Sequence, residues 1–315
     1  MSHAGSYESR RIAACDGLML HMRVYGSPID PGLPVVCLPG LSRNAADFDP
    51  LARALAAGTG GRKRRVVTID YRGRGASDRD RDWSNYSIPA ENADIVAVLT
   101  AIEISEAIFV GTSRGGLHIM ALAANHPTLI RAAVLNDIGP VIEAKGLARI
   151  RLHLRHLAAP NSLADSIDCL KKTMSAQFDG LSEADFEAHA RATFEKPDGS
   201  YGLTFDQRLV KPFEAIDLDE PLVPNWPLFE ALANVPLLVI RGSNSDILSA
   251  ETLTEMARRH ASCETYIAEG QGHAPLLYDK ASIERIAGFI GKIEDADRLP
   301  LGTEPRPAFE NTIAD

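Results

Sequence analysis

The hydrophobic positions along the chain change their pattern twice. Two opening runs, residues 11–14 and 18–25, flank Asp16-Gly17, a dipeptide typical of a tight hairpin turn, and so predict an antiparallel pair of strands. From Pro34 onward, short continuous apolar runs alternate with segments of helical periodicity. Strands that are apolar on both faces belong to a parallel sheet covered by helices on both sides. The pattern therefore predicts an α/β fold with a mostly parallel, twisted sheet.

The expected elements follow one another in a βα rhythm that is interrupted once. Before the interruption, the expected strands are 35–38, 65–69, 107–110 and 132–135, and the expected helices are 45–57, 89–104 and 113–125. Residues 140–228 then show helical periodicity, many charges and no convincing parallel strand. The rhythm resumes with strands 236–240 and 265–267 and helices 250–260 and 280–292.

This interruption divides the chain into four parts. We expect a first core part (1–139), an inserted helical cap (140–228), a second core part (229–294) and a C-terminal tail (295–315) rich in proline and charge. A chain of 315 residues is long enough for one large domain with such an insertion.

The candidate nucleophile is Ser113, in Gly111-Thr112-Ser113-Arg114-Gly115-Gly116. The segment lies between an expected strand and an expected helix, the position at which G-x-S-x-G forms a nucleophile elbow. Glycines two residues to either side let the backbone turn tightly without a clashing Cβ, so that the hydroxyl projects above the edge of the sheet. The neighbouring amides and the helix N-terminus favour developing negative charge.

A serine hydroxyl needs a general base, and the base needs an acid that fixes its tautomer. His273 is the candidate base, because it lies in a Gly-rich loop after the last expected strand, at the sheet edge where Ser113 also lies. If the acid precedes the histidine in the chain, Asp246, after strand 236–240, is the preferred candidate, since small residues around it let a carboxylate turn inward. Asp137, after strand 132–135, is the alternative, and otherwise a polar residue at the base of the cap.

The oxyanion of acyl transfer needs two preorganised donors, and backbone amides serve because they are already aimed. We expect one to be the N–H of Arg114, next to the nucleophile. The other is expected from the loop after strand 35–38, where Gly40 allows a close backbone approach and Leu41 supplies the N–H.

Together these residues resemble the α/β-hydrolase superfamily, in its cap-bearing branch of esterases, lactonases and C–C bond hydrolases. The resemblance spans about residues 11–292 and includes Asp70-Tyr71-Arg72-Gly73-Arg74-Gly75-Ala76-Ser77-Asp78, which is similar to the D-x-R-G-x-G-x-S segment of that superfamily, usually a structural one. Two positions depart from the pattern. Pro39 stands where histidine is common, and Arg114 where methionine or glutamine is frequent; both departures leave the backbone donors in place.

The resemblance implies acyl chemistry. An aspartate at the elbow would indicate a dehalogenase or an epoxide hydrolase, whereas this chain has Ser113. Enzymes of the superfamily that split C–C bonds of ring-cleavage products typically carry tryptophan after the histidine, whereas Ala274 follows His273. We therefore expect a serine hydrolase of a small ester or lactone, two substrates that sequence does not separate. A C–C bond hydrolase, and a small-ligand receptor with slow or no turnover, remain the alternatives.

Substrate specificity is expected to reside between cap and sheet. The aromatic residues of the cap are candidates either for the pocket wall or for the cap core: Phe178, Phe186, Phe194, Phe205, Phe213 and Trp226.

Charge and composition limit the partners. The net charge of -9 argues against nucleic-acid and anionic-membrane partners and favours a small-molecule substrate, while a homodimer stays open. The basic run 62–65 is interpreted as a solvated loop. We expect no metal and no cofactor: His153 and His156 lack a nearby acid, and the Gly73/Gly75 pair lacks the rest of a dinucleotide fingerprint. Without a signal-peptide pattern, a long apolar run or paired cysteines, the expected location is cytoplasmic.

Overall fold

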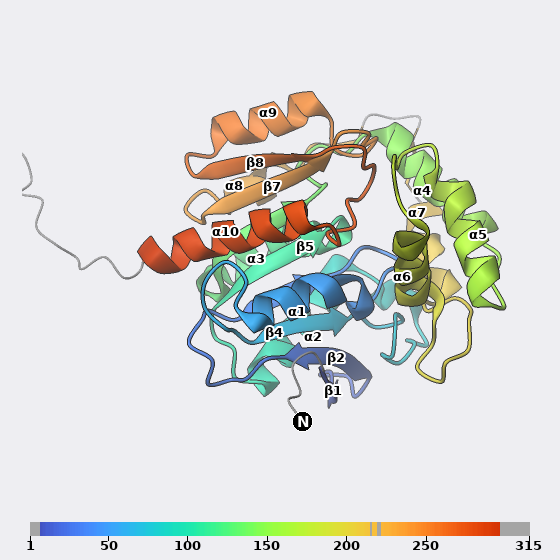
Figure 1. The fold of residues 1–315 in the computed structure, drawn as a ribbon, viewed down its shortest axis with the longest axis horizontal. Coiled ribbons are helices and arrows are strands. Elements are labelled where there is room, and N and C mark those ends of the chain that lie inside the picture. Colours follow the sequence, from blue (N-terminus) through green and yellow to red (C-terminus); the bar gives the residue numbers. More distant parts are fainter. Residues whose placement is uncertain (1–6, 215, 219–221, 297–315) are drawn as a thin grey trace, which may run out of the picture.

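Eight strands of the described residues form one sheet in the order β1-β2-β4-β3-β5-β6-β7-β8. The computed structural model describes residues 7–214, 216–218 and 222–296, with Figure 1 showing their arrangement. The strands are β1 (Glu8–Ala13), β2 (Met19–Tyr25), β3 (Val35–Leu38), β4 (Val66–Asp70), β5 (Ala107–Thr112), β6 (Ile130–Asn136), β7 (Leu237–Gly242) and β8 (Cys263–Ala268).

The expected hairpin and the expected parallel sheet are both confirmed. Strand β2 pairs antiparallel with β1 and with β4. All other neighbouring pairs are parallel, from β4–β3 to β7–β8. The carboxyl ends of β5, β6, β7 and β8 therefore lie next to one another at one edge of the sheet, which is where ligands bind in open α/β sheets.

The helices described by the structure alternate with these strands, except between β6 and β7, where several helices follow one another and form the insertion. In chain order they are α1 (Asp49–Ala57), α2 (Ile88–Ala101), α3 (Arg114–Asn125), α4 (Ala144–His156), α5 (Leu163–Met174), α6 (Glu183–Phe194), α7 (Lys211–Glu214), α8 (Trp226–Glu230), α9 (Ala250–Arg259) and α10 (Lys280–Ala296). Short 3₁₀ turns are η1 (Ala45–Phe48), η2 (Trp83–Asn85), η3 (Pro127–Leu129) and η4 (Gln207–Val210).

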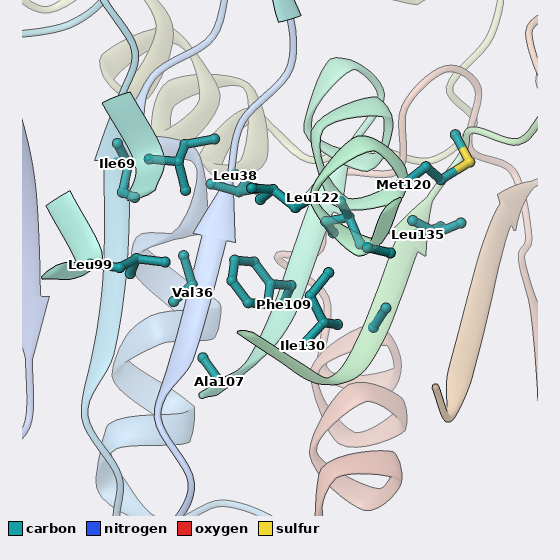
Figure 2. Close-up of a cluster of buried hydrophobic side chains, with 14 of the residues drawn as sticks. Val36, Leu38, Ile69, Leu99, Ala107, Phe109, Met120, Leu122, Ile130 and Leu135 are labelled. Atoms are coloured by element: carbon teal, nitrogen blue, oxygen red, sulfur yellow. The ribbon is translucent and has the colours of Figure 1, made fainter. Parts of the chain in front are cut away.

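Two hydrophobic cores lie on opposite faces of the sheet, which explains the continuous apolar runs. In β3, Val36 and Leu38 face a core shared with α2, α3, α8 and α9, whereas Val35 and Cys37 face a core shared with α1 and α10. Figure 2 shows part of the first core, where Phe109 lies among the side chains of neighbouring strands and helices. Both faces of the sheet are therefore covered, as predicted.

The helical insertion has its own hydrophobic cluster. Figure 1 shows α4, α5, α6 and α7 gathered at one end of the sheet, beyond its strands. Phe178, Phe186, Phe194 and Phe205 are buried in this cluster, while Trp226 packs against the core around α8. The cap aromatics thus mainly hold the cap together.

Other expectations have mixed outcomes. The basic run 62–65 is not wholly solvated: Arg64 is buried and its Nη1 donates to Glu294 over 2.8 Å. The tail lies outside the described residues, apart from Asp295 and Ala296 at the end of α10. Across the described ranges, no helix combines the length and the apolar character that a membrane span requires.

Candidate active site

Ser113 occupies a strained turn between β5 and α3. Its backbone has φ 52° and ψ -113°, a conformation that residues with a Cβ rarely adopt. A Cβ on Gly115 would overlap the carbonyl oxygen of Leu38, and a Cβ on Gly111 would lie 2.5 Å from the carbonyl carbon of Gly115. Close packing therefore requires both glycines of the G-x-S-x-G segment, Gly115 against β3 and Gly111 against the start of α3, and the elbow geometry is present.

A chain of two hydrogen bonds runs from Ser113 to a buried carboxylate. The Oγ atom of Ser113 lies 2.8 Å from Nε2 of His273, and Nδ1 of the same ring lies 2.8 Å from Oδ2 of Asp137. The side chain of Asp137 is fully buried and that of His273 is 6% exposed. Ser113 and His273 are thus brought together as predicted, and the acid beside the histidine is Asp137.

The prediction of Asp246 as the partner of His273 is wrong. The structure pairs the carboxylate of Asp246 with Arg149 of α4, through bonds of 2.6 Å from Nε and 2.8 Å from Nη2. Burial favours protonation of Asp246, yet hydrogen bonding and the charge of Arg149 hold its pKa below the ordinary value. A cap residue therefore engages this carboxylate, while Asp137 takes the position against the imidazole.

The surroundings of Asp137 fix its carboxylate as a hydrogen-bond acceptor. Its backbone has φ 59°, and its N–H donates to the carbonyl of Ile240 over 2.8 Å. Oδ1 accepts the N–H of Gly242 at 2.9 Å, and Oδ2 accepts the hydroxyl of Ser245 at 2.6 Å. These donors orient the carboxylate toward His273. Ser245 lies in the same loop as Asp246, and no sequence pattern indicates its bond to Asp137.

The two expected oxyanion donors flank Ser113. Arg114 is the first residue of α3, so its N–H has no partner within the helix. The oxyanion loop, residues 39–43, approaches from the other side: a Cβ placed on Gly40 would lie 3.8 Å from the Cβ of Ser113. Leu41 follows at once. The donor roles of Leu41 and Arg114 stay predictions that this placement supports.

The segment 70–78 is built as a scaffold, as the resemblance implied. The carboxylate of Asp70 accepts the N–H groups of Ala45 and Ala76, at 2.6 and 2.9 Å. The guanidinium of Arg72 forms a bidentate salt bridge with the carboxylate of Asp94, with hydrogen bonds of 2.6 and 2.7 Å. These buried bonds tie the loop after β4 to η1, through Asp70, and to α2, through Arg72.

A pocket of about 1100 Å³ opens above the serine. Ser113, His273 and Leu41 line it on the core side, and Ile150, Leu154 and Phe178 line it on the cap side. The wall mixes apolar side chains with polar and charged ones, Arg149 and Gln177 among them, and the reactive hydroxyl lies at the core side. Such a pocket suits a small organic substrate that carries polar groups. Of the six aromatic residues named from the sequence, Phe178 is the one that lines this pocket.

The cap and the oxyanion loop are in direct contact. Arg43 forms a bidentate salt bridge with Asp47. Its Nη1 atom also lies 2.8 Å from Nε2 of His189 in α6. Asn44 donates its side-chain amide to the carbonyl of Ala192 at 2.8 Å. The position of the cap is therefore coupled to the loop that borders the nucleophile.

The described residues contain no cluster of three or more His, Cys, Asp or Glu side chains placed to hold a metal ion.

Fold and site define the class of protein, and comparison with known proteins identifies the family. The sequence profile described as the alpha/beta hydrolase family matches residues 35–285, and the chain belongs to this family. It is 34% identical over 276 residues to a 3-hydroxybutyrate-oligomer hydrolase of Cupriavidus necator, covering 84% of this chain and 91% of that protein. It is 27% identical to the esterase YbfF of Escherichia coli, covering 76% and 85% of the two chains.

A solved structure extends the similarity to the three-dimensional fold of most of the chain. The crystal structure of an alpha/beta hydrolase from Novosphingobium aromaticivorans is 37% identical in sequence and superimposes with a TM-score of 0.81. The match covers 90% of this chain and 98% of the other. The predicted fold class and family are therefore confirmed.

Proposed function

We propose that the protein is a serine hydrolase that cleaves small carboxylic esters through Ser113, His273 and Asp137. The observation that carries this proposal is the continuous hydrogen-bonded chain from the Ser113 hydroxyl to the buried Asp137 carboxylate, at the core side of the pocket. A hydroxyl so placed can give its proton to the imidazole, whose tautomer the carboxylate fixes.

The reaction follows from this geometry in two halves. Oγ of Ser113 attacks the ester carbonyl while Nε2 of His273 takes its proton, and the oxyanion is met by the N–H groups of Leu41 and Arg114. His273 then protonates the leaving alcohol, and an acyl-enzyme remains. A water molecule, deprotonated by His273, attacks this ester and releases the acid, restoring the serine.

The similarity to a 3-hydroxybutyrate-oligomer hydrolase supports a more specific substrate class. We propose that the substrates include short esters of hydroxy acids, for which the large pocket has room. Lactones undergo the same acyl transfer and belong in the same test. No described feature favours C–C cleavage over these reactions.

Turnover of a chromogenic short-chain ester and of a 3-hydroxybutyrate dimer, by the wild type and by Ser113→Ala, tests the proposal. We expect the variant to lose at least about a thousandfold in kcat. A wild type without activity on any ester or lactone would contradict the proposal and favour a receptor. Activity confined to vinylogous diketones would favour the C–C hydrolase.

A further inference from the structure

Behind the two oxyanion residues lies a buried network of charged groups centred on Glu91 of α2. The carboxylate accepts Nη1 of Arg74 on one oxygen, at 2.6 Å, and Nε of Arg114 on the other, at 2.7 Å. The side chains of Glu91 and Arg74 are fully buried, and that of Arg114 is 12% exposed. Burying such charges is tolerated because each is paired.

The network reaches both sides of the nucleophile. Nε of Arg74 donates to the carbonyl oxygen of Leu41 over 2.9 Å, which holds the oxyanion loop from beneath. Arg114, the other oxyanion residue, is held through its own side chain. One carboxylate therefore connects, through two guanidinium groups, the two residues whose N–H groups border Ser113.

We propose that Glu91 is a positioning residue that sets the spacing of the oxyanion donors of Leu41 and Arg114. The inference rests on the proposed ester hydrolysis and on these two residues as donors. Small displacements of such donors matter, because they act on the charge that develops only in the transition state. The side chain of Arg114 thus has a role of its own, beyond that of its backbone amide.

A glutamine at position 91 breaks the network without changing its shape. Whichever way its amide is turned, the NH₂ group faces one of the two arginines and cannot accept a hydrogen bond. His118 adds to the constraint, since its Nε2 lies 2.9 Å from the oxygen that accepts Arg114. One of the two arginines then loses its bond to position 91, and keeps only its bond to a backbone carbonyl and its other contacts: Arg114 with Tyr86, Arg74 with Arg72.

Two other roles of Glu91 make different predictions. If only net charge mattered, Glu91→Gln would leave two arginine charges unopposed and would strengthen stabilisation of the oxyanion. If the network served only the fold, an equivalent buried pair would have the same effect on catalysis. Arg72–Asp94 is such a pair: Asp94 lies on the same helix and is 3% exposed, but Arg72 bonds Asp94, Asp80 and Asp16 instead of the oxyanion residues.

The experiment compares Glu91→Gln with Asp94→Asn in the full chain. The readouts are kcat and KM for 4-nitrophenyl butanoate and the inhibition constant of an alkyl trifluoromethyl ketone. Oγ of Ser113 adds to the ketone carbon, and the serine proton passes to His273. The electron pair of the carbonyl bond moves to the oxygen, which becomes an oxyanion. The inhibition constant of the ketone therefore reports on the oxyanion hole.

For Glu91→Gln we expect kcat to fall about tenfold, a part of the loss known for removal of one donor. The inhibition constant should rise by the same factor, with KM within about twofold of the wild type. Asp94→Asn should keep all three values within about twofold, even if its melting temperature falls. Arg114→Met removes the bonds of this side chain to Glu91 and to the carbonyl of Tyr86 and leaves the Arg74–Glu91 bond in place. This variant should lose several-fold in kcat, and it tests the inference if Glu91→Gln does not fold.

Unchanged or raised kcat in Glu91→Gln would overturn the inference, as would equal losses in Glu91→Gln and Asp94→Asn. If Glu91→Gln does not fold, unchanged kcat and inhibition constant in Arg114→Met would overturn it. A wild type inactive on esters would overturn the proposed function instead, so the two failures are distinguishable.

Discussion

The carboxylate of Asp137 lies 2.8 Å from Nδ1 of His273, and 136 residues of chain separate the two. Asp137 follows β6, the strand next to β5, whose end carries Ser113. His273 lies in the loop after β8, at the same edge of the sheet. The three side chains thus come from different strand-end loops, as the parallel topology allows.

Exchange of each aspartate for asparagine tests this assignment. We expect Asp137→Asn to lower kcat/KM for a chromogenic ester by about 10⁴-fold, because an amide stabilises the wrong imidazole tautomer and cannot stabilise the imidazolium. Asp246→Asn alters the contacts of this side chain with Arg149 and Gln177 and should cost less than about tenfold. Steady-state kinetics of both variants, with folding checked by circular dichroism, is the measurement. A crippled Asp246→Asn beside a nearly normal Asp137→Asn would refute the assignment.

The identity of the acid beside His273 could not be predicted from the sequence. Asp137 and Asp246 both follow strands that are neighbours in the sheet, so the rule that strand-end loops carry chemistry does not choose between them. The choice between the two aspartates depends on the positive φ at Asp137 and on the contact of Asp246 with Arg149. Arg149 lies 97 positions from Asp246 in the sequence. Neither feature is encoded in a local pattern.

Other features could be predicted because their causes are local. Continuous apolar runs between turns predict the buried strands. The glycines around Ser113 predict a tight turn, in which the structure leaves no room for a Cβ at these positions. The Glu91 network could not be predicted, because Arg74 and Leu41 belong to separate loops whose contact depends on the assembled sheet. Burial of Arg64 was missed for the same reason, since its partner Glu294 lies in α10.

Two glycine substitutions should have opposite effects on stability. Gly115→Ala places a Cβ against the backbone of Leu38, and we expect it to lower the free energy of unfolding by more than about 3 kcal/mol and to abolish activity. Gly288→Ala in α10 meets no atom within 4 Å and should raise the same free energy by about 0.5–1 kcal/mol. Urea unfolding measures both. A stable, active Gly115→Ala would contradict the described packing of the elbow.

His118 should make the stability of the protein depend on pH. Burial lowers its pKa from 6.5 to about 4 in the folded protein. Between these values the unfolded chain binds a proton that the folded protein does not, so stability falls as the pH falls from 6.5 to about 4. Over this range the wild type should lose up to about 3 kcal/mol more than His118→Gln, which keeps an N–H donor toward Glu91.

Unfolding by urea at several pH values between 6.5 and 4 gives the free energy of unfolding of each protein. The slope of this free energy against pH is then compared between the wild type and His118→Gln. Equal slopes for the wild type and His118→Gln would show that His118 titrates alike in the folded and unfolded chains, contrary to its buried environment.

The most direct test of the central claim is the stoichiometry of reaction with diethyl 4-nitrophenyl phosphate, followed by peptide mass spectrometry. An activated Ser113 should displace 4-nitrophenolate and carry one diethylphosphoryl group per chain, with esterase activity lost in the same proportion. Ser113→Ala should release no stoichiometric 4-nitrophenolate and should retain at most about a thousandth of the wild-type activity. Full activity in chains labelled at Ser113, or labelling and turnover that persist in Ser113→Ala, would contradict the account.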